Sequence, residues 1–398
     1  MHRIHSFGLT AWAFSATLWA ASVTDAPVGW ASQNGGTTGG AGGTEVTVTT
    51  MADLQKYAKM PGKYVIWVEG TMGSYGTRGN GNGDRVVVAG DKSILGQPGA
   101  HIKGGFDINN VKNVILRNLI VEGPGAVDND GGTAGEGRQD AISIVNEAKN
   151  IWLDHLTVMD GEDGNADVTK ASDFVTMSWC KFTYTSKSYP SGTSGMSHRF
   201  CNLIGGGDSE KSSAGVSSEG KLNVTFYKCW WGEGVAERMP RVRFGKVHVV
   251  NSLFNSTDAG QGHCVRAGFK ADLLVESNVF IGQKKPIDLF DGDFTAITAK
   301  NNVFTNCTGN TAGSGTAFTP SYTLTPAATG SLQAEISNAS SGAGPTLTWG
   351  TTTAIRMDPA PAAARRATAL LPGVWILHPD EPGMARILDL SGRTLTGF

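Results

Sequence analysis

The sequence predicts an all-β chain that folds as a parallel β-helix, in which short strands stack coil upon coil. From about residue 110 a phrase recurs in which alternating apolar residues follow a polar residue and end beside Asn, Ser or Cys. Its later copies, at 246–254, 272–280 and 296–304, recur at intervals of about 23–26 residues and end on Phe. One such strand cannot bury its apolar face alone, whereas stacked coils can. A β-sandwich also has short, regularly spaced strands, but the repeated Asn-x-Phe ending favours stacking.

The composition agrees with this fold class. The 398 residues include 54 Gly and only 17% charged residues, which favours many turns over long amphipathic helices. The length allows more than one average domain, although a single elongated fold can absorb most of it. The net charge of −2 gives no reason to expect nucleic-acid binding or attachment to a membrane surface. Any field that binds a charged substrate must therefore be local.

The two ends of the chain carry features of an exported protein. Residues 1–26 place a short apolar run, which ends in small residues, after His2 and Arg3, and this is the layout of a secretory signal peptide. No later segment is long and apolar enough to span a bilayer, so we expect a soluble, secreted protein. The stretch 346–373, rich in Ala, Pro and Thr, predicts a flexible linker. Residues 374–398 resemble a C-terminal secretion tag; a disordered tail is the alternative.

The cysteines do not predict a metal site. None of them follows the CxxC or Cys/His spacing of a zinc site. Because there are five cysteines, at least one thiol is unpaired within the chain, and the sequence allows one or two disulfides.

Acidic residues mark a candidate cation site. Asp163 and Asp167 stand four residues apart on a strand-like stretch, so their side chains share a face. Asp140 and Lys187 lie about one coil before and after Asp163, which places three carboxylates and an ammonium group on one outward face. Clustered carboxylates repel one another unless a cation neutralises them, and hard oxygen ligands suit Ca²⁺. The alternative is that these aspartates cap turns in solvent.

A basic run completes the candidate site. Arg238, Arg241 and Arg243 lie within six residues that Pro240 stiffens, outside any charged tail. Acidic cation ligands beside fixed arginines indicate chemistry on an anionic polymer. The alternative is a structural pair of arginines that satisfies acceptors between coils. Long Gly- and Ser-rich insertions, at 123–138 and 188–221, are expected to form the walls of the binding cleft.

Four ordered motifs resemble the pectate lyases of polysaccharide lyase family 1. They run from Asp140 to His155, from Asp163 to Asp167, from 173 to 179, and from Arg238 to 251. The resemblance covers 27–345 and implies a right-handed, single-stranded parallel β-helix with long cleft-forming loops. It also implies a monomeric enzyme that acts on polygalacturonate, the demethylated form of pectin.

The resemblance assigns roles to individual residues. Asp140, Asp163 and Asp167 match the calcium-binding positions, although Glu often stands where this chain has Asp163. Some members have an additional Asp where this chain has Arg138, and loop acids could compensate for it. These acids are Asp128, Asp130 and Glu136.

Basic residues carry the remaining roles. Arg238 matches the catalytic base and Arg243 the arginine that clamps the substrate, within an Arg-x-Pro-x-x-Arg pattern whose variable positions include Arg241. Lys187 matches the substrate-binding lysine, and Arg199 is a second candidate for that role. An arginine base is unusual because a guanidinium normally stays protonated; nearby cations and high pH favour its neutral form.

The implied reaction is β-elimination. Ca²⁺ and Lys187 bind the uronate carboxylate, Arg238 removes the C5 proton, and the C4–O bond breaks to leave a 4,5-unsaturated product. A pectin lyase would act on methyl-esterified substrate, where calcium bridging has no purpose. A glycosidase would need two carboxyl groups flanking the bond and no arginine. A non-catalytic, calcium-stabilised carbohydrate-binding β-helix is the third alternative. His155 is expected to have a structural role in a turn.

Overall fold

The computed structural model describes residues 21–23, 25–76, 81, 83–126, 139–188, 198–258, 261–290 and 292–349, and the backbone of three strands between 366 and 388. The chain divides into two units, Met1–Thr352 and Thr353–Phe398. Residues 1–20 of the predicted signal peptide and most of the predicted linker and tail lie outside the described residues.

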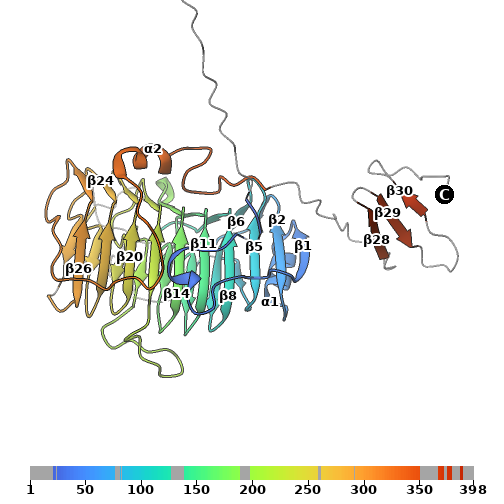
Figure 1. Cartoon of the computed structure of the whole chain (residues 1–398), viewed down its shortest axis with the longest axis horizontal. Coiled ribbons are helices and arrows are strands. Elements are labelled where there is room, and N and C mark those ends of the chain that lie inside the picture. The colour runs from blue at the N-terminus through green and yellow to red at the C-terminus, as the bar shows by residue number, and fades with distance from the viewer. Residues whose placement is uncertain are drawn as a thin grey trace, which may run out of the picture. The chain divides into compact units, whose positions relative to one another are not determined.

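The first unit is a parallel β-helix, as the sequence predicts, and three parallel sheets form its sides (Figure 1). We call the ten-stranded sheet the long sheet. The long sheet contains, in order, β1 (Thr44–Val48), β2 (Tyr64–Val68), β5 (Lys92–Gly96), β8 (Lys112–Arg117), β11 (Lys149–Asp154), β14 (Asp173–Ser178), β17 (Val224–Tyr227), β20 (Lys246–Val250), β23 (Asp272–Glu276) and β26 (Ala296–Lys300). All of its neighbouring strands pair in parallel.

Two shorter sheets complete each coil. The eight-stranded sheet contains β4 (Arg85–Val87), β7 (Gly105–Asn109), β10 (Ile142–Val145), β13 (Ala166–Val168), β16 (Leu203–Ile204), β19 (Arg241–Val242), β22 (Val265–Ala267) and β25 (Ile287–Leu289). The nine-stranded sheet contains β3 (Thr71–Gly73), β6 (His101–Lys103), β9 (Ile120–Glu122), β12 (Thr157–Met159), β15 (Lys181–Thr183), β18 (Trp230–Trp231), β21 (Leu253–Phe254), β24 (Val279–Ile281) and β27 (Val303–Thr305). β16 corrects one expectation, because it lies inside the stretch 188–221 that the sequence predicts to be a single long insertion.

A repeated backbone turn links the long sheet to the nine-stranded sheet. Seven residues at equivalent positions adopt a left-handed conformation, with φ between 49° and 59°. They are Asn118, His155, Trp179, Lys228, Asn251, Ser277 and Asn301. Asn tolerates this conformation better than most residues with a Cβ, which explains why Asn recurs near the end of the sequence phrase. His155 therefore occupies a turn, as expected.

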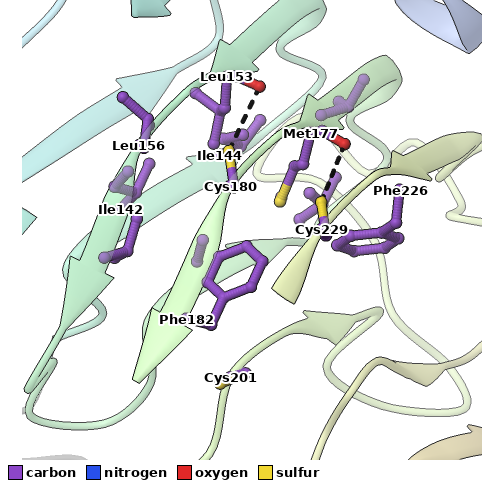
Figure 2. Close-up of a cluster of buried hydrophobic side chains, with 14 of the residues drawn as sticks. Ile142, Ile144, Leu153, Leu156, Met177, Cys180, Phe182, Cys201, Phe226 and Cys229 are labelled. Atoms are coloured by element: carbon purple, nitrogen blue, oxygen red, sulfur yellow. Dashed lines mark hydrogen bonds between the residues drawn. The ribbon is translucent and has the colours of Figure 1, made fainter. Parts of the chain in front are cut away.

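The interior is packed by aligned side chains from successive coils. Ring centroids of Trp231 and Phe254 lie 4.5 Å apart, and those of Phe254 and Phe280 lie 4.2 Å apart, in stacked pairs. The repeated Phe of the sequence phrase thus forms the stack that it predicts. Figure 2 shows another part of this core, where the thiols of Cys180 and Cys229 donate to the carbonyls of the neighbouring coil at 3.5 and 3.3 Å. All five cysteines are free thiols, so the disulfides that the sequence left open do not form.

Helices and terminal segments cover the surfaces that the coils leave open. α1 (Met51–Lys59) buries Leu54 and Ala58 in the core beside β2 and β4, and α2 (Leu332–Ile336) packs on the nine-stranded sheet. Three short 3₁₀ turns are η1 (Gly29–Ser32), η2 (Ser186–Ser188) and η3 (Thr329–Ser331). On the outer face of the long sheet, the Trp349 ring lies 5.0 Å from the Trp67 ring. At the far end, Ser314 exchanges two backbone hydrogen bonds of 2.8 Å with Ile297 of β26.

The second unit contains a three-stranded antiparallel sheet. Its strands are β28 (Arg366–Leu371), β29 (Val374–His378) and β30 (Arg386–Leu388). β28 lies within the range that the sequence predicts to be a linker. Among the helices of the described residues, none is long and apolar enough to cross a membrane.

Candidate active site

A line of outward-facing residues, which we call the outer line, runs across the eight-stranded sheet. It contains one residue from each strand, and parallel pairing aligns them. In order they are Val87, Asp107, Ser143, Asp167, Leu203, Arg241, Arg266 and Asp288. The residues that alternate with them, such as Ile144 and Val242, are fully buried in the core. The pairing therefore places Asp107 and Asp167 early in the outer line and the guanidinium groups of Arg241 and Arg266 later, followed by Asp288 at its end.

Asp140 and Asp167 direct their carboxylates toward the same glycine. A Cβ added at Gly164 would lie 2.9 Å from Asp140 Oδ1 and 3.3 Å from Asp167 Oδ1. The amide of Leu203 donates to Asp167 Oδ1 at 2.9 Å, whereas Asp140 Oδ1 is buried without a hydrogen-bond partner among the described residues. Burial, followed by the charge of Asp163, raises the pKa of Asp140 to about 6. Burial and the charge of Asp140 raise the pKa of Asp167 well above its ordinary value.

Asp163 is more exposed than the other two acids. Of its side chain 41% reaches solvent, and its Oδ1 lies 3.6 Å from His198 Nε2. In the part of the chain that the structure describes, no three His, Cys, Asp or Glu side chains form a ready metal cluster. Asp140 Oδ1 is a buried oxygen without a partner among the described residues, and neighbouring acids oppose the ionisation of Asp140 and Asp167; both observations nevertheless fit a hard cation. The predicted loop contributors Asp128, Asp130 and Glu136 lie outside the described residues, and so does Arg138, which replaces an acid of some family members.

Arg85, which the sequence analysis missed, holds the backbone of Asp140. Its Nη1 donates to the Asp140 carbonyl at 2.6 Å, and its Nη2 donates to the Phe106 carbonyl at 2.8 Å. The side chain crosses Gly105, where a Cβ would lie 2.2 Å from Nη1. Burial lowers the pKa of Arg85, against the opposing charges of Asp107 and Asp140. β4 precedes the first recognisable repeat, so coil spacing could not reveal this residue; the glycine that opens β7 was the available signal.

Arg238 lies in the turn that leads into β19. Its backbone φ is 58°, a left-handed conformation that is uncommon for a residue with a Cβ. The guanidinium carbon lies 4.4 Å from the centre of the Phe200 ring. Its positive charge lowers the pKa values of Asp140 and Asp167, against the larger effect of burial. The structure therefore brings the predicted base and the two buried acids onto one surface.

Arg243 lies directly after β19 and contacts acceptors at the rim of the sheet. Its Nε donates to Asp208 Oδ1 at 2.8 Å, and its Nη1 donates to the Gly205 carbonyl at 3.0 Å. The Asp208 side chain is 61% exposed, so solvent screens this ion pair. The pair therefore leaves Arg243 open to exchange one carboxylate for another.

The other two predicted substrate-binding residues are paired with different acids. Lys187 Nζ contacts the Glu122 carboxylate and lies 4.1 Å from the centre of the Tyr75 ring. Arg199 Nε and Nη2 donate to the two oxygens of Asp258 at 2.8 and 2.9 Å. Glu122 and Asp258 are not among the three predicted metal ligands.

A buried histidine lies close to the residue that precedes Arg238. His263 Nδ1 is 3.5 Å from Glu237 Oε2, and the histidine side chain is completely buried. Burial, and then the charge of Arg266, lower the pKa of His263 to about 2, so the ring is neutral. Burial raises the pKa of Glu237. No spacing in the sequence pointed to this pair.

Comparison with known proteins identifies the family of the chain that carries this site. The sequence model of the pectate lyase family matches residues 8–344. The chain belongs to the pectate lyase family. Pectate lyase A of Aspergillus niger is 34% identical over 338 residues, which cover 83% of this chain and 90% of that protein. A pectate trisaccharide-lyase of Thermotoga maritima is 36% identical over 242 residues, and the match spans only 59% of each protein.

Solved pectate lyase structures have the same fold. A mutant pectate lyase of Bacillus subtilis superposes with a TM-score of 0.63 at 19% identity, covering 84% of this chain and all of that one. A pectate lyase of Bacillus sp. N165, solved in complex with trigalacturonate, gives a TM-score of 0.56 at 23% identity, covering 80% and 98%. At these identities the likeness establishes the parallel β-helix and leaves the roles of individual residues to this chain's own geometry.

Proposed function

We propose that this chain is a secreted pectate lyase that cleaves polygalacturonate by calcium-dependent β-elimination and releases 4,5-unsaturated oligogalacturonates. One observation carries the proposal. The buried carboxylates of Asp140 and Asp167 converge on the surface that also carries Arg238, whose positive charge lowers the pKa values of both acids against the larger effect of burial. Family membership supports the reaction class, and the trigalacturonate bound to a related fold supports the substrate class.

In this proposal, Asp140, Asp163 and Asp167 hold the cation. When bound there, Ca²⁺ supplies positive charge that attracts a uronate carboxylate and stabilises charge developing beside C5. Arg238 accepts the C5 proton, and the electrons of the broken C–H bond form the C4–C5 double bond as the C4–O bond breaks. The departing oxygen takes its proton from water. Arg243 clamps a substrate carboxylate in exchange for its exposed partner.

Ultraviolet absorbance tests this function directly. Purified protein is incubated at alkaline pH with polygalacturonate, in calcium or in a chelator, and then with highly methylated pectin. We expect an unsaturated-product band that needs calcium and is strongest on polygalacturonate. A calcium-independent band on methylated pectin alone would establish a pectin lyase instead. Saturated reducing ends without the band would establish a glycosidase, and binding without cleavage a carbohydrate-binding protein.

A further inference from the structure

Arg241 occupies a place in the site to which the sequence pattern assigns no role. It lies on β19 in the outer line, between Leu203 of β16 and Arg266 of β22. Only two residues separate it from Arg238, which the proposed function uses as the base. Its backbone is fixed, because its amide donates to the Asn202 carbonyl at 3.0 Å. Arg241 therefore has a fixed backbone position on the strand that follows the proposed base.

The surroundings of Arg241 are cationic. Burial lowers its pKa to about 10, and the charges of Arg243, Arg266 and Arg238 add to this effect. The charge of Glu237 opposes the shift, and its influence is smaller than that of each of the three arginines. A cation held among cations leaves a local field that attracts an anion.

The hydrogen-bonding capacity of Arg241 is not filled by the protein. Within the described residues its Nε is buried and has no hydrogen-bond partner. The neighbouring Arg266 differs, because its Nε donates to Asp288 Oδ2 at 2.5 Å. Both guanidinium groups lie over the Phe290 ring, with carbon-to-centroid distances of 5.1 Å for Arg241 and 4.3 Å for Arg266. Phe290 thus holds Arg241 in place without satisfying its donors.

We propose that Arg241 binds the carboxylate of a uronate residue next to the one at which Arg238 acts, and so selects demethylated substrate. A buried charged donor without an acceptor is costly, and the planar fork of a guanidinium matches a carboxylate. A methyl ester at that residue removes the negative charge and one acceptor. The inference rests on the proposed function, because it takes polygalacturonate as the substrate.

The test compares Arg241→Gln with Arg241→Lys and with a control, Lys246→Gln, which removes an exposed positive charge from the long sheet. Steady-state kinetics are measured on polygalacturonate and on pectins of increasing methylation. We expect Arg241→Gln to raise KM on polygalacturonate by about tenfold or more, with kcat little changed. Its preference for demethylated over methylated substrate should fall by a similar factor. Arg241→Lys should recover part of the loss, and the control should behave as wild type.

Other outcomes separate this inference from the function on which it rests. An unchanged KM in Arg241→Gln, with wild-type cleavage intact, would overturn the inference and leave the proposed function standing. A lower thermal midpoint at unchanged KM would assign Arg241 a structural role. If the wild type forms no unsaturated product, calorimetry can still test whether Arg241 binds a uronate carboxylate. Equal affinities of wild type and Arg241→Gln for polygalacturonate would refute the subsite.

Discussion

At Arg238, the guanidinium lies over the Phe200 ring, and its charge acts on two buried carboxylates, those of Asp140 and Asp167. We predict that Arg238→Ala lowers kcat by at least about 100-fold, which is the usual contribution of a positioned acid or base. Alanine meets the same positive-φ restriction, so the fold should change little. Absorbance at the unsaturated product band measures the rate, and circular dichroism checks the fold. A variant that folds and retains full activity would remove Arg238 from the chemical step.

The raised pKa of Asp140 has a consequence for stability. An aspartate whose pKa rises from 3.8 to about 6 on folding binds more protons in the folded state than in the unfolded state between these values. In a chelator, stability should therefore fall as the pH rises through this window, by up to about 3 kcal/mol from this group. Denaturant unfolding at pH 4 and pH 7 measures the difference, and Asp140→Asn should reduce it. An equal slope in that variant would place the titrating group elsewhere.

Residue spacing predicted part of the site. One coil separates Asp140 from Asp163, so a period read from the sequence predicted a shared surface, and two of its acids do meet at Gly164. The same spacing linked Lys187 to the acids, but its side chain contacts Glu122. Spacing fixes where a Cα lies along the helix and leaves open which of several nearby partners a long side chain selects.

In the long sheet, Asp154 closes strand β11 with a buried network. It accepts hydrogen bonds from Arg117 Nε at 2.7 Å and Ser178 Oγ at 2.6 Å, and contacts His155 Nδ1 at 2.9 Å. Although burial opposes it, these partners lower the pKa of Asp154. Removing one partner of a buried pair leaves an uncompensated charge.

We predict that Asp154→Asn lowers the free energy of unfolding by about 3–5 kcal/mol and leaves kcat per folded molecule unchanged. Glu219 offers a control, because it pairs with Lys270 at 2.7 Å but has a 61% exposed side chain. Glu219→Gln should cost less than about 1 kcal/mol. Denaturant titration of both variants compares them, and similar losses would contradict the buried network.

Elements that repeat were predictable and those that interrupt the repeat were not. The strands of the long sheet follow from alternating apolar residues, and the Phe stack follows from the recurring phrase. β16 has only Leu203 and Ile204, which is too short to carry a period of its own. Its place depends on pairing with Val168 and Val242 of neighbouring coils, and such partners are distant in the sequence.

For the whole molecule, contacts of the first unit extend through Trp349. Its Nε1 donates to the Gly96 carbonyl at 2.7 Å, and its ring covers Trp67. We predict that a chain ending at Thr352 keeps the thermal midpoint and the activity of the full chain. A chain ending at Pro345 should melt several degrees lower, by about 2–4 °C per kcal/mol of lost packing. Calorimetry of the two truncations tests this, and equal midpoints would show that Trp349 contributes nothing.

A stack of parallel strands can be extended by a further strand, because its last strand presents unpaired backbone amides and carbonyls. Here the chain folds back on β26, and Ser314 pairs with Ile297 in the antiparallel sense. Gly313 permits this approach, since a Cβ there would lie 2.1 Å from the Ile297 carbonyl oxygen. The reversed segment breaks the pattern that a second molecule would have to continue. The reversed segment at Ser314 therefore occupies backbone groups of β26 that a second molecule would otherwise find unpaired.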